Sequence, residues 1–142
     1  ETAARVTADG KLPVVIGDSS QLIALFQNLI ANGIKFHRPG VTPEVVVTAK
    51  EETAGWHLRV IDNGIGIEAS KKNRIFERFY RVDASRSHGD STNCGLGLAI
   101  VKGYAELLGA GLEVTSELGQ GSMFKIVLPA PLAKEVFATS GV

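Results

Sequence analysis

The sequence predicts an α/β fold, arranged as an α+β sandwich in which helices cover one face of a mixed, mostly antiparallel sheet. Three observations carry this prediction. Residues 44–50 and 56–62 are two strand patterns joined by a short polar loop, which favours an antiparallel pair. Residues 20–37 and 95–108 carry apolar side chains at helical spacing. Two further strand patterns, 112–116 and 122–128, flank a turn at 119–121.

The composition indicates a single domain with its own core. The chain has 142 residues, of which 44% are hydrophobic. Its 15 basic and 15 acidic residues cancel, and no basic run alternates with aromatic residues, so we expect no nucleic acid partner. No apolar run reaches the roughly 20 residues that span a bilayer, so we expect no direct membrane contact. The lone cysteine, Cys94, excludes an intrachain disulfide and favours a cytoplasmic location.

The elements follow in order along the chain. Residues 5–16 predict a hairpin that turns at Asp9-Gly10 and returns along 13–16. Asp18 to Ser20 offer an N-cap for the helix over 20–37, which ends near Pro39-Gly40. Its predicted apolar stripe comprises Leu22, Phe26, Leu29, Gly33 and Phe36. A short helix is expected over 71–81, and the polar segment 83–94 has the length of a mobile lid. The domain is expected to span 1–131, with 132–142 as a tail or linker.

Two glycine turns point to a nucleotide. Asp62 shares the inward parity of Leu58 and Val60 and precedes Asn63-Gly64-Ile65-Gly66. The second turn, Gly95-Leu96-Gly97-Leu98, opens the helix over 95–108, whose first amides are free to meet phosphate oxygens. One turn therefore offers a carboxylate for a base, and the other offers amides for phosphate.

A polar helix face lies beside the predicted apolar stripe. Asn28, Asn32 and Lys35 fall within one narrow sector of the helix over 20–37. An amide oxygen of Asn32 suits Mg²⁺, and the ammonium of Lys35 suits phosphate. In isolation such a face is more often only solvated, but the two glycine turns downstream favour the nucleotide interpretation.

Four segments occur together in a recognisable order. They are Asn28-Leu29-Ile30-Ala31-Asn32-Gly33-Ile34-Lys35-Phe36, Asp62-Asn63-Gly64-Ile65-Gly66-Ile67, Arg74-Ile75-Phe76-Glu77-Arg78-Phe79-Tyr80-Arg81-Val82 and Gly95-Leu96-Gly97-Leu98-Ala99-Ile100. The chain resembles the catalytic, ATP-binding domain of sensor histidine kinases, whose Bergerat fold is shared with gyrase, Hsp90 and MutL. The match covers nearly the whole chain, and four ordered motifs are far more specific than one glycine-rich loop.

The resemblance implies ATP and Mg²⁺ as cofactors and assigns roles to individual residues. Asp62 would accept a hydrogen bond from the adenine amino group, Gly64 and Gly66 would admit the base, and Asn32 would bind the metal. Asn32, Lys35 and Arg81 would act in catalysis. The implied nucleotide contacts are Asn28, Asn32, Lys35, Phe36, Asp62, Gly64, Gly66, Ile67, Tyr80, Arg81, Gly95, Leu96, Gly97 and Leu98.

The segment before the lid leaves an alternative open. The resemblance places Arg81 on the terminal phosphate, with Phe76 and Phe79 anchoring the start of the lid. Arg74, Arg78 and Arg81 also fit a solvent-facing stripe, and Glu77 is spaced to pair with Arg81.

Three positions depart from the family pattern. Gly33 stands where the family usually has Ala and is expected to cost roughly 1 kcal/mol of helix stability. Asn93-Cys94 replaces Gly-Thr, which predicts a stiffer lid hinge. Ala110 replaces a late glycine, with only local effects on packing.

The resemblance implies the kinase part of a two-component sensor. It would present the terminal phosphate of ATP to a histidine on a separate dimerisation domain of the same protein, and reach a response regulator indirectly. None of the three histidines here lies in a helical-bundle context, so we expect the acceptor elsewhere. A self-contained ATPase of the gyrase or Hsp90 kind is the alternative, but Asn28 stands where those relatives carry a Glu that activates water. A degenerate domain without turnover is the third possibility, and membrane anchoring of the parent protein stays open.

Overall fold

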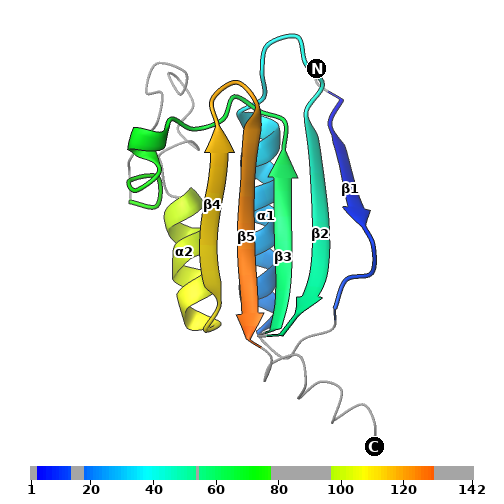
Figure 1. Ribbon diagram of the computed structural model, residues 1–142, viewed down its shortest axis with the longest axis vertical. Coiled ribbons are helices and arrows are strands. Elements are labelled where there is room, and N and C mark those ends of the chain that lie inside the picture. Colours follow the sequence, from blue (N-terminus) through cyan, green and yellow to red (C-terminus); the bar gives the residue numbers. More distant parts are fainter. Residues whose placement is uncertain (1–2, 14–17, 54, 78–96, 130–142) are drawn as a thin grey trace, which may run out of the picture.

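Five strands form one sheet in the order β1-β2-β3-β5-β4 (Figure 1). The computed structural model describes residues 3–13, 18–53, 55–77 and 97–129. The strands are β1 (Arg5–Asp9), β2 (Glu44–Glu52), β3 (Gly55–Asp62), β4 (Gly111–Glu117) and β5 (Gly121–Pro129). β1 runs parallel to β2, and the other neighbouring pairs are antiparallel. The mixed, mostly antiparallel sheet predicted from the sequence is therefore confirmed.

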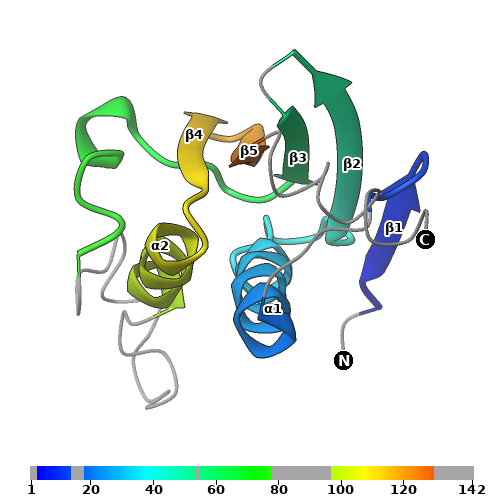
Figure 2. The same cartoon turned by 90° about the horizontal axis from the view of Figure 1, so that it is seen from below.

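Two helices lie side by side on one face of this sheet (Figure 2). They are α1 (Ser19–Lys35) and α2 (Gly97–Leu107). Asp18 caps α1 as predicted, since its carboxylate accepts a hydrogen bond from the amide of Gln21 at 3.1 Å. Within the described part of the chain, no helix is long and apolar enough to cross a membrane.

The core fills the space between the helices and the inward face of the sheet. Alternate residues of β3 and β5 point inward, as period-two strands require, and meet the buried residues of both helices. The buried hydrophobic residues are Leu25, Leu29, Val45, Val47, Leu58, Val60, Ile75, Val101, Ala105, Phe124, Ile126 and Leu128. The same inward parity carries past Val60 to Asp62, at the end of β3.

The apolar stripe of α1 is rotated from the predicted one. Leu25, Leu29 and Gly33 are the buried residues of the helix, whereas Leu22 and Phe26 are only partly buried. Phe36 lies one residue beyond the helix end and is exposed. The prediction overlooked Leu25 because Leu22 and Phe26 lie within the same broad apolar arc, and tertiary packing decides which part of such an arc faces the core.

The predicted helix over 71–81 is wrong for its described part. The 3-10 helix η1 (Ala69–Lys71) is followed by turns up to residue 76, with hydrogen bonds between residues three apart, such as Arg74 N to Lys71 O at 3.0 Å. Ile75 is buried, and the adjacent Phe76 packs edge-on against Phe124 with ring centres 6.3 Å apart. Because Ile75 and Phe76 are neighbours in the sequence, a turn is enough to bring both of them to the core. The segment 71–77 is also too short to have much helical stability of its own.

The predicted N-terminal hairpin is seen only in part. Gly10 has a φ of 83° and follows β1, which fits the expected turn at Asp9-Gly10. However, β1 pairs in parallel with β2, and residues 11–13 are not in a strand. The rest of the predicted returning strand, 14–16, and the predicted lid, 83–94, lie outside the described residues.

Candidate functional site

The Asp62 carboxylate lies at the end of β3, under α1. In the sheet register Asp62 is opposite Val45 of β2 and Ser122 of β5. A Cβ placed on Gly33 of α1 would lie 3.0 Å from the Asp62 Cβ, so the two residues are in contact. The inward orientation expected for Asp62 is thus what the structure shows.

Two backbone amides converge on one oxygen of this carboxylate. Oδ1 accepts hydrogen bonds from the amides of Gly64, at 2.9 Å, and Ser122, at 3.2 Å. Burial raises the pKa of the Asp62 carboxyl above its ordinary value, and the amides of Gly64 and Ser122 oppose that rise. Among the described residues, no hydrogen bond is recorded to the second oxygen, Oδ2. The arrangement holds one oxygen within the protein and leaves the other for a donor.

The glycine turn after Asp62 is packed against the protein's own backbone. A Cβ on Gly64 would lie 2.5 Å from the carbonyl oxygen of Phe36, and one on Gly66, whose φ is 76°, would overlap the carbonyl of Glu117. Ile65 is fixed at both of its polar backbone atoms, donating to Phe36 O at 2.9 Å and accepting from Gly119 N at 2.7 Å. Close packing therefore requires both glycines, a reason that the sequence analysis did not give.

Asn63 stabilises the glycine turn after Asp62 through hydrogen bonds to the segment before β2, a role that was not predicted from the sequence. Its side chain accepts from the amide of Glu44 at 2.9 Å and donates to the carbonyl of Thr42 at 3.1 Å. Its carbonyl accepts from Nε of Arg38 at 2.9 Å. The signal was available in part, because Asn next to Gly commonly bonds nearby backbone groups. Asn63 thus joins the end of β3 to the segment that leads into β2.

Asn28 and Asn32 of α1 both face the first residue of α2. A Cβ on Gly97 would lie 3.5 Å from Nδ2 of Asn32 and 3.6 Å from Oδ1 of Asn28. The amide of Asn28 also donates to the carbonyl of Ala24 at 2.6 Å, which orients its oxygen. The structure therefore brings together the polar face of one helix and the amino end of the next, where the amides of a helix are free to bind anions.

The remaining predicted site residues are spread over several elements, and some of them lie outside the described residues. Lys35 is the last residue of α1, and its Nζ lies 5.4 Å from the ring centre of Phe36. Ile67 donates its amide to Oγ of Ser116, and Leu98 packs against the core. Arg74 pairs with Glu77 at 3.3 Å on the exposed surface. The predicted residues Arg78, Phe79, Tyr80, Arg81, Gly95 and Leu96 lie outside the described residues, as do Asn93 and Cys94.

Two serines near Asp62 were also missed by the sequence analysis. Ser116 of β4 and Ser122 of β5 face each other with their hydroxyl oxygens 2.9 Å apart. Each has the inward parity of its strand, shared with Val114 and Phe124, respectively. A polar residue at an inward position beside a glycine turn is a signal that sequence alone provides.

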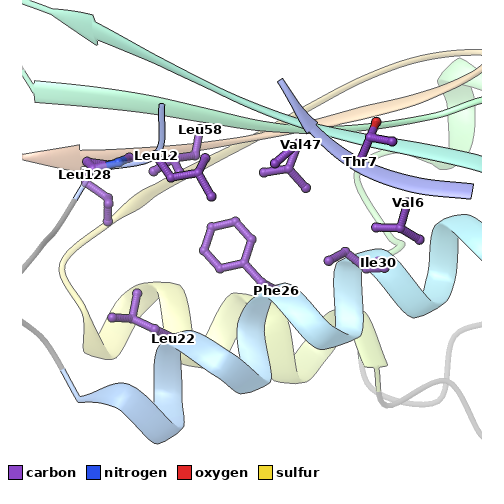
Figure 3. A pocket seen from close by; sticks show the side chains of 11 residues that line it. Val6, Thr7, Leu12, Leu22, Phe26, Ile30, Val47, Leu58 and Leu128 are labelled. Atoms are coloured by element: carbon purple, nitrogen blue, oxygen red, sulfur yellow. The ribbon is translucent and has the colours of Figure 1, made fainter. Parts of the chain in front are cut away.

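A separate apolar groove lies beside α1, on the side away from Asn28 and Asn32 (Figure 3). It has a volume of about 500 Å³, and Phe26 projects into it from α1 toward β2 and β3. Its lining residues are Val6, Thr7, Ala8, Leu12, Pro13, Leu22, Phe26, Ile30, Val47, Leu58 and Leu128. Among the described residues that line it, none is charged and none is a predicted site residue, so this groove is not the predicted nucleotide site.

Comparison with known proteins adds independent findings. Residues 17–132 match the family described as histidine kinase-, DNA gyrase B-, and HSP90-like ATPase. The chain is similar to cyanobacterial phytochrome A of Nostoc sp., with 42% identity over 130 residues that make up 91% of this chain and 16% of the relative. It is also similar to the sensor histidine kinase RppB of Synechocystis sp., with 42% identity over 113 residues, 80% of this chain and 24% of the relative. The chain thus spans only about a sixth to a quarter of these curated relatives.

Solved structures show the same fold. The mycobacterial sensor histidine kinase MprB superposes with a TM-score of 0.72 and 35% identity, covering 88% of this chain and 81% of that one. Full-length ShkA in complex with AMPPNP superposes with a TM-score of 0.69 and 31% identity, covering 92% of this chain and 25% of that one.

Proposed function

Because the chain belongs to the histidine kinase-, DNA gyrase B- and HSP90-like ATPases, as a catalytic ATP-binding domain of the sensor histidine kinase type, we propose how its residues bind the nucleotide. Adenine lies against Asp62, and the phosphates lie at the amino end of α2. Asn32 of α1, which lies beside Gly97, would hold a Mg²⁺ ion that neutralises the phosphate charge. The observation that carries this proposal is the Asp62 carboxylate, whose Oδ1 is held by two amides at the helix-covered end of β3.

The carboxylate accounts for a choice of adenine over guanine. Oδ2 of Asp62 is the oxygen that accepts from the adenine amino group, because Oδ1 is already bonded to Gly64 and Ser122. Guanine presents a carbonyl oxygen at the same place, so two acceptors would face each other and neither would be paired. The pocket is therefore selective for ATP.

The facing asparagines suit a hydrated magnesium ion. Mg²⁺ in phosphate sites keeps several waters and takes one or two protein oxygens together with phosphate oxygens. The side chains of Asn28 and Asn32 meet at Gly97, where the amino end of α2 also favours phosphate. The metal, when bound, neutralises phosphate charge. Asn32 supplies the oxygen ligand, and Lys35, at the end of α1, supplies a further positive charge.

We infer that the reaction is transfer of the terminal phosphate to a histidine rather than rapid hydrolysis. The acceptor is a histidine on a dimerisation domain of the same protein, a response regulator is reached indirectly, and the domain works on the cytoplasmic side. Catalysis then consists of positioning and charge neutralisation. Asn28 supports this choice over a clamp ATPase, because its amide, which donates to Ala24, cannot take a proton from water.

Titration calorimetry with ATP, with and without Mg²⁺, tests the assignment. Asp62→Asn removes a charge-assisted hydrogen bond worth roughly 1.5–3 kcal/mol, so ATP affinity falls about ten- to a hundredfold in either condition. Asn32→Ala weakens Mg·ATP more than metal-free ATP. Unchanged ATP affinity in a folded Asp62→Asn protein would place the adenine pocket elsewhere.

A further inference from the structure

Ser116 makes three hydrogen bonds at the end of β4. Its Oγ lies 2.8 Å from the amide of Ile67, 2.9 Å from the carbonyl of Gly121 and 2.9 Å from Oγ of Ser122. A hydroxyl can donate one hydrogen bond and accept two. All three contacts are satisfied together when Ser116 donates to Gly121, and Ile67 and Ser122 both donate to Ser116.

These contacts join the two segments that hold Asp62. One amide on Oδ1 of Asp62 comes from Gly64, in the turn that ends at Ile67, and the other comes from Ser122, at the start of β5. Ser116 bonds to both segments, although it does not touch Asp62 itself through any hydrogen bond recorded in the described residues. It is therefore the common support of the two donors.

The surrounding backbone leaves these segments little room to adjust separately. Gly121, with a φ of 124°, lies directly against the carbonyl of Asp62, and Gly66 lies against the carbonyl of Glu117. Ser122 is buried, with 8% of its surface exposed. Loss of the Ser116 hydroxyl would leave the amide of Ile67 and the hydroxyl of Ser122 without this acceptor, and both segments would shift to recover partners.

We propose that Ser116 is a positioning residue for adenine recognition, which holds the amides of Gly64 and Ser122 on one oxygen of Asp62 and thereby directs the other oxygen toward the base. The inference rests on the proposed role of Asp62. It adds a specificity-determining residue from β4, a strand that supplies none of the predicted nucleotide contacts.

The test compares ATP with purine riboside triphosphate, which lacks only the 6-amino group. In the wild-type chain ATP binds about ten- to a hundredfold more tightly than the analogue, since only ATP donates to Asp62. In Ser116→Ala this ratio falls at least about fivefold, while affinity for the analogue changes less than about twofold. Calorimetry with both ligands in the presence of Mg²⁺ gives the two affinities directly.

Three further variants separate positioning from general support of the fold. Ser116→Thr keeps the hydroxyl and restores the ratio. Thr115→Ala removes a hydroxyl from the neighbouring, exposed position of the same strand and leaves the ratio unchanged. Ser116→Cys, which bonds weakly with nearly the same shape, gives an intermediate ratio and serves if Ser116→Ala does not fold.

The outcomes distinguish this inference from the proposed function. If the wild-type chain binds ATP and the analogue equally, Asp62 does not read the amino group and the proposed function itself fails. If the wild-type chain discriminates but Ser116→Ala and Ser116→Cys discriminate equally well, or lose affinity for both ligands in parallel, Ser116 supports only the fold and the inference is overturned.

Discussion

At the scale of single residues, Asp62 combines its proposed role in binding adenine with a cost to the stability of the fold. Burial raises its pKa because the ionised form loses water, and the amides of Gly64 and Ser122 return only part of that loss. In the absence of a ligand the neutral form is thus favoured relative to an exposed Asp. The nucleotide's amino group would supply the missing donor.

The stability of the ligand-free domain should reflect this cost. The pKa of Asp62 is higher in the folded state than its ordinary value of 3.8. The contribution of Asp62 to stability is therefore fully present below pH 3.8 and is lost as the pH rises through the folded-state pKa. At neutral pH we expect ligand-free Asp62→Asn to unfold at the same or a higher temperature than the wild type, measured by circular dichroism. A clear loss of stability would mean that the ionised carboxylate supports the fold.

ATP binding should depend on pH in the opposite sense. Only the ionised carboxylate offers the full charge-assisted bond, so we expect ATP affinity to fall as the pH drops through the raised pKa of Asp62. Titrations of the wild type and Asp62→Asn across the acidic range check this expectation. The difference between the two proteins removes the titration of ATP itself, and equal pH profiles would exclude Asp62 as the titrating group.

At the scale of elements, two helical glycines offer a matched comparison. A Cβ on Gly103 of α2 would meet nothing within 4 Å, whereas one on Gly33 of α1 would lie 2.9 Å from Cγ2 of Val45. We expect Gly103→Ala to stabilise the fold by about 0.8–1 kcal/mol, the ordinary helix-propensity gain. Gly33→Ala should lose most of that gain to the crowding beside Val45 and Asp62. Urea unfolding of both variants measures the difference in their free energies of unfolding. Equal gains would show that β2 and β3 can shift to accommodate the new methyl group at little cost.

The elements also show where sequence patterns suffice. The strand patterns at 44–50 and 56–62 and the helical spacing in 20–37 predicted β2, β3 and α1 within two residues at each end. The helical spacing in 95–108 predicted the end of α2 within one residue, and its predicted start lies outside the described residues. The segment that follows Glu68 was mispredicted, because its turns depend on Ile75 and Phe76 reaching a core built from distant strands. The pairing of β1 with β2 was missed for the same reason, since parallel pairing leaves no local turn signal.

At the scale of the whole molecule, the proposed role of the chain is to bind nucleotide without rapid hydrolysis. The resemblance places Asn28 where clamp ATPases carry a Glu that activates water, and its amide donates to the carbonyl of Ala24 in the same helix. We expect the isolated chain to bind Mg·ATP and hydrolyse it far more slowly than the median enzyme rate of roughly 10 s⁻¹. Release of inorganic phosphate measures the rate. Turnover near that median would instead favour a self-contained ATPase.

The site as a whole was only partly predictable from sequence. The alternation of the strand predicted that Asp62 points inward, and the helical spacing predicted that Asn28 and Asn32 share one face. Both predictions depend only on regular local geometry. The contact of Asn28 and Asn32 with Gly97 depends on how separate elements pack, which no local pattern encodes. The inward parity of Ser116 and Ser122 was readable from the sequence, but their hydrogen bonds to the segments that hold Asp62 were not.

The sequence distance between Asp62 and its two amide donors determines when this site can form during folding. The two amides on Asp62 come from residues two and 60 positions along the sequence, so the second arrives only when β5 has joined β3. Contacts of such long range are the slow ones in folding, because the chain must close a large loop before they form. Competence to bind nucleotide should therefore appear during refolding together with the completed sheet, and not with the earlier, local helices.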